Sequence, residues 1–104
     1  MKVLLINGSP NREGCIHTAL SEVAATLQAN DIETEMLYLG KKPIAGCIAC
    51  GKCLDTGCCF REDLVQEIQR RLDEFDGLVI GSPVYYSGPS GQLVSFLNRL
   101  FYAT

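Results

Sequence analysis

A strand that runs directly into a glycine-bounded loop and then into a helix is the feature that most constrains this chain. Val3–Ile6 is apolar, the loop lies between Gly8 and Gly14, and the helix begins near Cys15. This order builds a seat for a phosphate group, because backbone N–H groups and the helix dipole converge there. The loop has neither the G-x-G-x-x-G pattern of dinucleotide sites nor the Gly-Lys-Ser/Thr ending of a P-loop.

The loop presents neutral hydrogen-bond donors toward such a phosphate. They are backbone amides and the side chains of Ser9, Asn11 and Thr18. The alternative interpretation is an ordinary helix start capped by small polar residues. The apolar strand before the loop, at the start of an α/β pattern, favours the phosphate seat.

The rest of the chain alternates between helical and strand patterns. Helical spacing with apolar residues on one side predicts three helices, and short apolar or alternating runs predict three strands. In chain order these are a strand at 3–6, a helix that begins near residue 15 and ends at 30–31, a strand at 33–39, a helix at 61–75, a strand at 78–80 and a last helix. The apolar side of the last helix carries Leu93, Phe96, Leu97, Leu100 and Phe101. Residues 40–59 are predicted to be a loop. The expected fold is a three-layer α/β/α domain whose parallel strands lie in the order 2-1-3.

Ligands of such sheets bind at the carboxyl ends of the strands, at the point where the strand order reverses. Here that point lies between the first and third strands, so the loops Gly8–Thr18 and Ser82–Gly88 should meet there. Val84, Tyr85 and Tyr86 could form a flat wall for a planar heteroaromatic ring. The alternative is that the two tyrosines pack against the following helix.

Charge and length exclude several classes of function. The net charge of −3 and the pI near 5.0 argue against nucleic-acid binding. No apolar run reaches membrane-spanning length and none resembles a signal peptide, so the expectation is a cytoplasmic protein without a membrane partner. Residues 1–104 are expected to form a single domain.

Five of the six cysteines lie in one segment. Cys47, Cys50 and Cys53 have C-x2-C-x2-C spacing, and Cys58 and Cys59 follow. Three thiolates at this spacing, with Cys59 or Cys58 as the fourth, could hold a [4Fe–4S] cluster or zinc. The alternatives are reduced thiols or an adventitious disulfide. Cys15 is interpreted as a packing residue or a backbone donor position.

Three motifs resemble a known family. INGSPNREGCIHTAL, GCIACGKCLDTGCC and IGSPVYYSGPSGQLVSFLNRLFYA are similar to the flavodoxin-like NAD(P)H-dependent FMN reductases and to the iron–sulfur flavoproteins. The resemblance implies an oxidoreductase that passes hydride from NAD(P)H to FMN and electrons on to a small acceptor. It implies that the FMN phosphate is surrounded by Ser9, Asn11, Gly14, Cys15, Ile16, His17 and Thr18. It likewise implies that the isoalloxazine ring is lined by Pro83, Val84, Tyr85, Tyr86 and Ser87.

The chain departs from the family pattern in two ways. Ile16 and His17 stand where relatives often carry a small hydroxyl residue and an aromatic one; His17 is either a phosphate donor or an exposed residue of the helix start. Relatives also continue beyond the position of Thr104, so we expect a partial domain whose third strand, at Leu78–Ile80, recruits a second copy or a partner chain. The alternative functions are an iron–sulfur flavoprotein-type electron carrier and a non-catalytic domain that acts through a partner.

Overall fold

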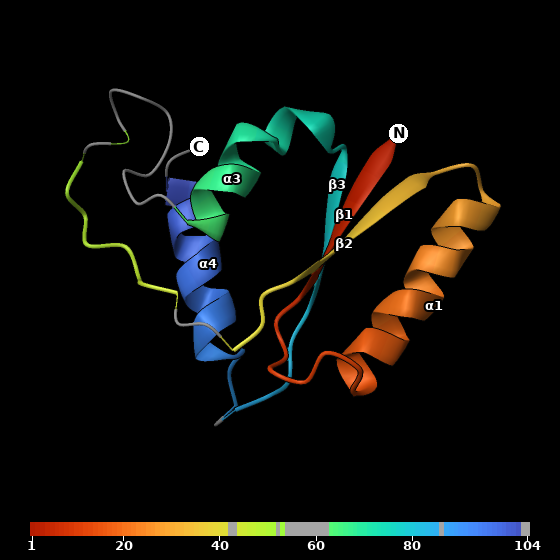
Figure 1. The fold of residues 1–104 in the computed structure, drawn as a ribbon, viewed down its shortest axis with the longest axis horizontal. Coiled ribbons are helices and arrows are strands. Elements are labelled where there is room, and N and C mark those ends of the chain that lie inside the picture. Colours follow the sequence, from red (N-terminus) through yellow and green to blue (C-terminus); the bar gives the residue numbers. More distant parts are fainter. Residues whose placement is uncertain (42–43, 52, 54–62, 86, 103–104) are drawn as a thin grey trace.

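Three strands and the helices around them form three layers, with the sheet in the middle (Figure 1). The computed structural model describes residues 1–41, 44–51, 53, 63–85 and 87–102. The elements are β1 (Lys2–Asn7), α1 (Cys15–Ala29), β2 (Glu33–Tyr38), α3 (Leu64–Arg70), a 3₁₀ turn (Leu72–Glu74), β3 (Gly77–Gly81) and α4 (Gly91–Tyr102). No helix in these described ranges is long and apolar enough to cross a membrane.

The strands are parallel and lie in the order β2-β1-β3, which confirms the predicted topology. Lys2 pairs with Glu33 at the start of β1, and Asn7 pairs with both Tyr38 and Gly81 at its end. β2 lies at one edge, as its alternating polar residues predicted. All three strands therefore end at the same side of the molecule, where the loops after β1 and β3 emerge.

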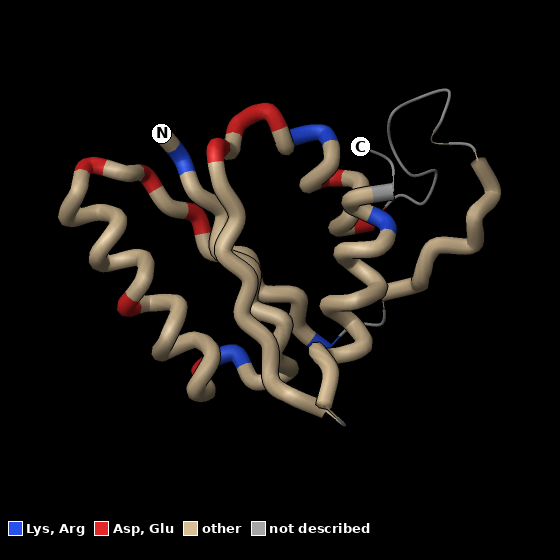
Figure 2. The backbone as a smooth tube through the Cα atoms, turned by 180° about the vertical axis from the view of Figure 1, so that it is seen from behind, with Lys and Arg blue, Asp and Glu red and all other residues tan. Residues whose placement is uncertain are grey.

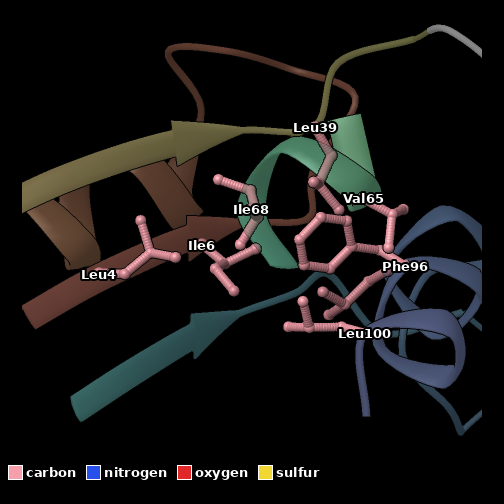
Figure 3. Close-up of a cluster of buried hydrophobic side chains, with 8 residues drawn as sticks. Leu4, Ile6, Leu39, Val65, Ile68, Phe96 and Leu100 are labelled. Atoms are coloured by element: carbon pink, nitrogen blue, oxygen red, sulfur yellow. The ribbon is translucent and has the colours of Figure 1, made fainter. Parts of the chain in front are cut away.

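Each face of the sheet has its own apolar cluster. Leu4 and Ile6 of β1 face α3 and α4, whereas Val3 and Leu5 face Leu20 of α1. The larger cluster is shown in Figure 3; its buried members are Leu4, Ile6, Leu39, Val65, Ile68, Leu93, Phe96 and Leu100. This alternation along one central strand is what places helices on both faces.

The helix predicted over 61–75 is shorter in the structure, where α3 ends at Arg70 and a 3₁₀ turn follows. Arg71 interrupts the helix at φ −106° and ψ 4°, and its N–H bonds to the carbonyl of Ile68 at 3.0 Å. The tighter hydrogen bonds turn the chain toward β3. On the predicted apolar side of α4, Phe101 is about half exposed, while the other members are buried or partly buried.

β3 has one hydrogen-bonded neighbour, β1, among the described residues. Leu78 packs in the cluster on one face and Val79 in the cluster on the other, as predicted for a strand covered on both sides. Ile80, near its carboxyl end, is 42% exposed. An apolar edge strand of this kind is prone to pair with another strand.

Charged residues gather at the opposite end of the sheet, where the strands begin (Figure 2). The Arg71 guanidinium donates to both oxygens of Glu35, at 2.9 and 2.7 Å, and to Glu74 at 3.1 Å. Lys2 Nζ lies 3.6 Å from each of these carboxylates. The hydrogen bonds from Arg71 lower the pKa of Glu35 below its ordinary value.

Replacing Glu35 by Gln is expected to lower the free energy of unfolding at neutral pH by less than about 1 kcal/mol, because the pair is partly exposed. The lowered pKa makes this contribution fully present above the carboxyl's unfolded value of 4.5; it is lost as pH falls through the lower folded value. Urea unfolding at pH 7 and at about pH 3 should show the difference at the higher pH only. Glu33→Gln, on the exposed start of β2, is the matched control. A difference that grows at low pH would contradict this assignment.

Candidate functional site

The loops after β1 and β3 are joined directly at Gly8. Its N–H donates to the carbonyl of Gly81 at 2.8 Å, and its carbonyl accepts from the Ser90 hydroxyl at 2.7 Å. A Cβ at Gly8 would lie 3.0 Å from the Leu93 side chain of α4, which is tighter than ordinary contact, so Leu93 would have to shift to admit it. The predicted meeting of the two loops is therefore confirmed.

Ser90 ties three segments together, although sequence reasoning did not single it out. It is 4% exposed, and its hydroxyl oxygen accepts from the N–H of Leu93 at 3.3 Å, which caps α4. Its own N–H donates to the Ser82 hydroxyl at 2.9 Å, and that hydroxyl donates to the carbonyl of Pro83 at 2.9 Å. The sequence could have indicated this role, because Ser90 stands directly before an apolar helix and serine is a preferred N-cap residue.

Hydrogen bonds from side chains fix the conformation of the candidate phosphate-binding loop, residues 8–14. The buried Asn7 accepts from the N–H of Ser9 through Oδ1 at 2.9 Å. The Ser9 hydroxyl oxygen in turn accepts from the N–H of Asn11 at 3.1 Å. A hydroxyl that accepts in this way keeps its own proton for donation. Asn7 was not predicted as a site residue, because it belongs to the strand rather than to the loop.

The first turn of α1 opens onto this loop. Its N-cap is Gly14, which offers no side chain to the first N–H groups, and the turn carries no acidic residue. The alternative of a helix start capped by small polar side chains is therefore wrong at the N-cap position. The Thr18 hydroxyl donates back to the carbonyl of Gly14 at 3.3 Å. Cys15 is exposed, so it is not a packing residue. Uncapped N–H groups at a helix start favour an anion.

Ile16 and His17 have different environments. Ile16 turns into the core beside Gly81, where a Cβ added to the glycine would approach Ile16 Cγ2 to 2.7 Å. His17 is half-buried rather than exposed, and its Nε2 lies 3.4 Å from the Ser21 hydroxyl. Only His17 of the two can present a polar side chain at the loop.

A pocket of about 370 Å³ lies beside the loop, between the start of α1 and the end of β2. It is lined by Asn7, Arg12, His17, Met36 and Tyr38. The Arg12 guanidinium carbon lies 5.4 Å from the centre of the Tyr38 ring, and the Tyr38 hydroxyl donates to the carbonyl of Pro10 at 2.6 Å. The interpretation of the loop as a set of neutral donors overlooked Arg12, which adds a full positive charge.

The loop after β3 makes a tight turn. Tyr85 and Gly88 exchange two backbone hydrogen bonds, of 2.8 and 3.0 Å, and Ser87 between them has a left-handed φ of 63°. Val84 is 77% exposed and Tyr85 52% exposed. Tyr85 is therefore not a buried residue, and about half of its side chain is open to solvent. Tyr86 lies outside the described residues.

The cysteine segment follows β2. Cys47 and Cys50 are exposed, Cys53 is half-buried, and all three are free. The Cys47 sulfur accepts from the N–H of Ala49 at 3.4 Å. Thiolates suit a soft metal, but no group of three His, Cys, Asp or Glu within the described ranges is close enough to hold one. The three described thiols therefore do not form a metal site by themselves; Cys58 and Cys59 lie outside the described residues.

Comparisons with known proteins identify the family to which the whole chain is similar. The family model "NADPH-dependent FMN reductase" matches residues 1–104. An iron–sulfur flavoprotein of Methanocaldococcus jannaschii is 39% identical over 95% of this chain and 51% of its own length. Iron–sulfur flavoproteins of Archaeoglobus fulgidus and Methanosarcina thermophila are 33% and 27% identical, over 96% and 95% of this chain and 46% and 52% of their own lengths.

A three-layer α/β fold whose parallel strands lie in the order 2-1-3 is that of the flavodoxin-like class of proteins. Within that class, the chain belongs to the NADPH-dependent FMN reductase family. It spans about half the length of the curated relatives that it matches.

Proposed function

We propose that this chain carries the FMN-binding half-site of an NAD(P)H-dependent oxidoreductase. The observation that carries the proposal is the junction at Gly8, which joins the loops after β1 and β3 by direct hydrogen bonds. The phosphate would lie against the loop and first turn of α1, at Ser9, Asn11, Gly14, Cys15, Ile16, His17 and Thr18. The ring would lie against Pro83, Val84, Tyr85, Tyr86 and Ser87.

Bound FMN supplies the capacity to accept hydride and to release electrons. The chain's own residues bind and orient it. N–H groups at the start of α1 carry no side-chain cap and can donate to an anion, and Arg12 adds positive charge beside them. The buried Ser9 shapes the loop by accepting from the N–H of Asn11. The exposed Val84 and Tyr85 offer an apolar wall to a ring. NAD(P)H as hydride donor, a small electron acceptor and a cytoplasmic location belong to the same proposal.

The direct test adds FMN to the purified chain under anaerobic conditions and then removes free flavin by gel filtration. The proposal expects flavin absorbance to co-elute with the protein and to bleach when NADPH or dithionite is added. Flavin that elutes entirely as the free compound would overturn the proposal. Flavin that stays bound but bleaches with dithionite alone would overturn only the choice of nicotinamide as donor.

Replacing Arg12 by Gln is expected to weaken FMN binding by about threefold to tenfold at low salt, because one positive charge near the phosphate is lost. The effect of Arg12→Gln on FMN affinity should shrink as ionic strength rises. Fluorescence titration of FMN at low and at high salt measures the affinity and its salt dependence. Arg70→Gln, on the exposed surface of α3, removes the same charge far from the loop and should change nothing. Equal effects of the two variants would contradict a local role for Arg12.

A second candidate is an electron carrier of the iron–sulfur flavoprotein type. It is favoured by the C-x2-C-x2-C spacing and by the relatives named iron–sulfur flavoproteins. Cys47, Cys50, Cys53 and Cys59 would then be the ligands of a [4Fe–4S] cluster, or of zinc. If a cluster is bound, anaerobically purified protein should show broad visible absorption and acid-labile sulfide. Protein that shows neither of these signals and that contains no zinc would contradict this candidate function.

We further propose that the free edge of β3 pairs with a strand outside this chain, from a second copy or from a partner. Its support is the apolar composition of that edge and the exposure of Ile80. A non-catalytic domain that acts through a partner chain would use the same edge. Light scattering should detect an oligomer of the isolated chain; a monodisperse monomer that also binds no partner strand would contradict the proposal.

A further inference from the structure

The pocket of about 370 Å³ between the start of α1 and the end of β2 contains a buried side chain with an unused donor. Asn7, at the end of β1, lines this pocket and is 1% exposed. Its Oδ1 accepts from the N–H of Ser9 at 2.9 Å, so its Nδ2 keeps two N–H groups to donate, and no described residue accepts them. Every fully buried side-chain nitrogen or oxygen in the described part of the chain has a partner, so Nδ2 opens onto the pocket.

β2 supplies the apolar walls of the pocket. Met36 and Tyr38 are two residues apart on this strand, so both side chains lie on the face of the sheet that α1 covers. Met36 packs with Leu5 in the apolar cluster on that face. Tyr38 pairs with Asn7, and its hydroxyl donates to the carbonyl of Pro10 at 2.6 Å, which fixes the loop after β1 beside the pocket. A thioether and an aromatic ring therefore lie next to the Asn7 amide.

Two basic side chains complete the lining of the pocket. The Arg12 guanidinium carbon lies 5.4 Å from the centre of the Tyr38 ring, and Arg12 forms no ion pair with a described residue. His17 of α1 is half-buried; its Nε2 lies 3.4 Å from the Ser21 hydroxyl, which leaves Nδ1 without a partner among the described residues. No acidic residue is among the described residues that line the pocket. Donors that have no carboxylate beside them favour an anionic ligand.

We propose that this pocket binds a small planar carboxylate, at a site separate from the phosphate seat at the start of α1. The Asn7 Nδ2 and the Arg12 guanidinium are the donors for the two carboxylate oxygens, and Met36 and Tyr38 contact the apolar body of the ligand. A volume of about 370 Å³ is within the range of small-molecule sites. A free phosphate would use the donors but leave the apolar walls uncovered, so a carboxylate with a carbon body fits better. The inference goes beyond the proposed function, because it does not require FMN.

Benzoate is the probe, and the test uses the full chain without flavin. Arg12 and His17 also belong to the proposed FMN site, so the signals are followed at Asn7 and Met36, which belong to the pocket alone. In an NMR titration, the side-chain amide signals of Asn7 and the methyl signal of Met36 should shift together, with a dissociation constant of about 1 mM for so small a ligand. Met1, the other methionine, lies before the start of β1, at the opposite end of the strand, and its methyl signal should not move.

Two further anions test the chemistry of the site. Acetate should bind at least about fivefold more weakly than benzoate, because it has no ring to cover the apolar walls. Inorganic phosphate should not displace benzoate, since the phosphate seat lies at the start of α1. The proposal would be overturned by benzoate that moves neither the Asn7 nor the Met36 signals at about 20 mM. Complete displacement of benzoate by phosphate, or acetate that binds as tightly as benzoate, would also overturn it.

Asn7→Asp tests the donor amide directly. The new carboxylate keeps an oxygen for the N–H of Ser9, but it replaces the Nδ2 donor by an acceptor that repels a bound carboxylate. Benzoate should therefore bind at least about tenfold more weakly. Asn98→Asp, on the exposed surface of α4, adds the same charge outside the pocket and should change the benzoate affinity by less than about twofold. Equal losses of affinity in the two variants would overturn the proposal.

A second pair of variants keeps the test decisive if circular dichroism shows that Asn7→Asp does not fold. Arg12 is exposed, so Arg12→Gln should leave the fold intact. It should weaken benzoate binding, followed at the Met36 methyl signal, by at least about fivefold, because the carboxylate loses its cation. Arg70→Gln removes the same charge on the exposed surface of α3 and should change the affinity by less than about twofold. An unchanged benzoate affinity in Arg12→Gln would overturn the proposal.

Discussion

Replacing Ser90 by Ala is expected to lower the free energy of unfolding by about 2–3 kcal/mol and to weaken FMN binding at least tenfold. The substitution leaves the buried carbonyl of Gly8 without its donor and removes the cap of α4. It also removes the Ser90 hydroxyl, whose hydrogen bond to Gly8 links the loop after β1 to the start of α4. Urea unfolding and an FMN fluorescence titration measure the two effects.

Ser95→Ala is the control for Ser90→Ala, because it makes the same chemical change inside α4, away from the loop junction. It should leave both the free energy of unfolding and the FMN affinity nearly unchanged. If Ser90→Ala matched this control in FMN affinity while it destabilised the fold, Ser90 would support the domain but not the site.

Replacing Gly81 by Ala is expected to lower the free energy of unfolding by about 1–3 kcal/mol, because the added methyl group overpacks the core. It would meet Ile16 Cγ2 at 2.7 Å and Leu20 at 3.2 Å. Ile16 belongs to the first turn of α1, so relief of the clash should move that turn away from the loop and weaken FMN binding as well. Gly91→Ala, where a Cβ meets no atom within 4 Å, is the control.

A double-mutant cycle separates this clash from other effects of Gly81→Ala. Ile16→Ala removes the atom that the new methyl group meets. The loss of unfolding free energy caused by Gly81→Ala should therefore be at least about 1 kcal/mol smaller in the Ile16→Ala background than in the unaltered chain. Chemical denaturation of the four chains gives the coupling. If the two substitutions changed the free energy of unfolding additively, the contact with Ile16 would not be the cause of the destabilisation.

Hydrophobic periodicity was sufficient to predict the order of the elements and the sheet topology. The stripe containing Leu20 and the run Leu78–Ile80 indicated a helix and a strand, and together with the connections they specified the order 2-1-3. Periodicity could not predict where the helix before β3 ends, because the break at Arg71 depends on a tertiary turn toward β3 and on hydrogen bonds to Glu35.

The candidate site was predicted in part. The two loops were found because glycine, serine and proline mark them in the sequence. The residues that join them were missed, because Ser90 and Gly8 are far apart in the chain and the hydrogen bond between them leaves no periodic signal.

The most direct test of the central claim compares the affinities of the chain for FMN and for riboflavin, which lacks the phosphate. If the loop at residues 8–14 and the start of α1 form the phosphate seat, FMN should bind at least about tenfold more tightly, since charge-assisted hydrogen bonds to the phosphate would be missing for riboflavin. Fluorescence titration at low salt measures both dissociation constants. Equal affinity for the two flavins, or binding of neither, would contradict the account.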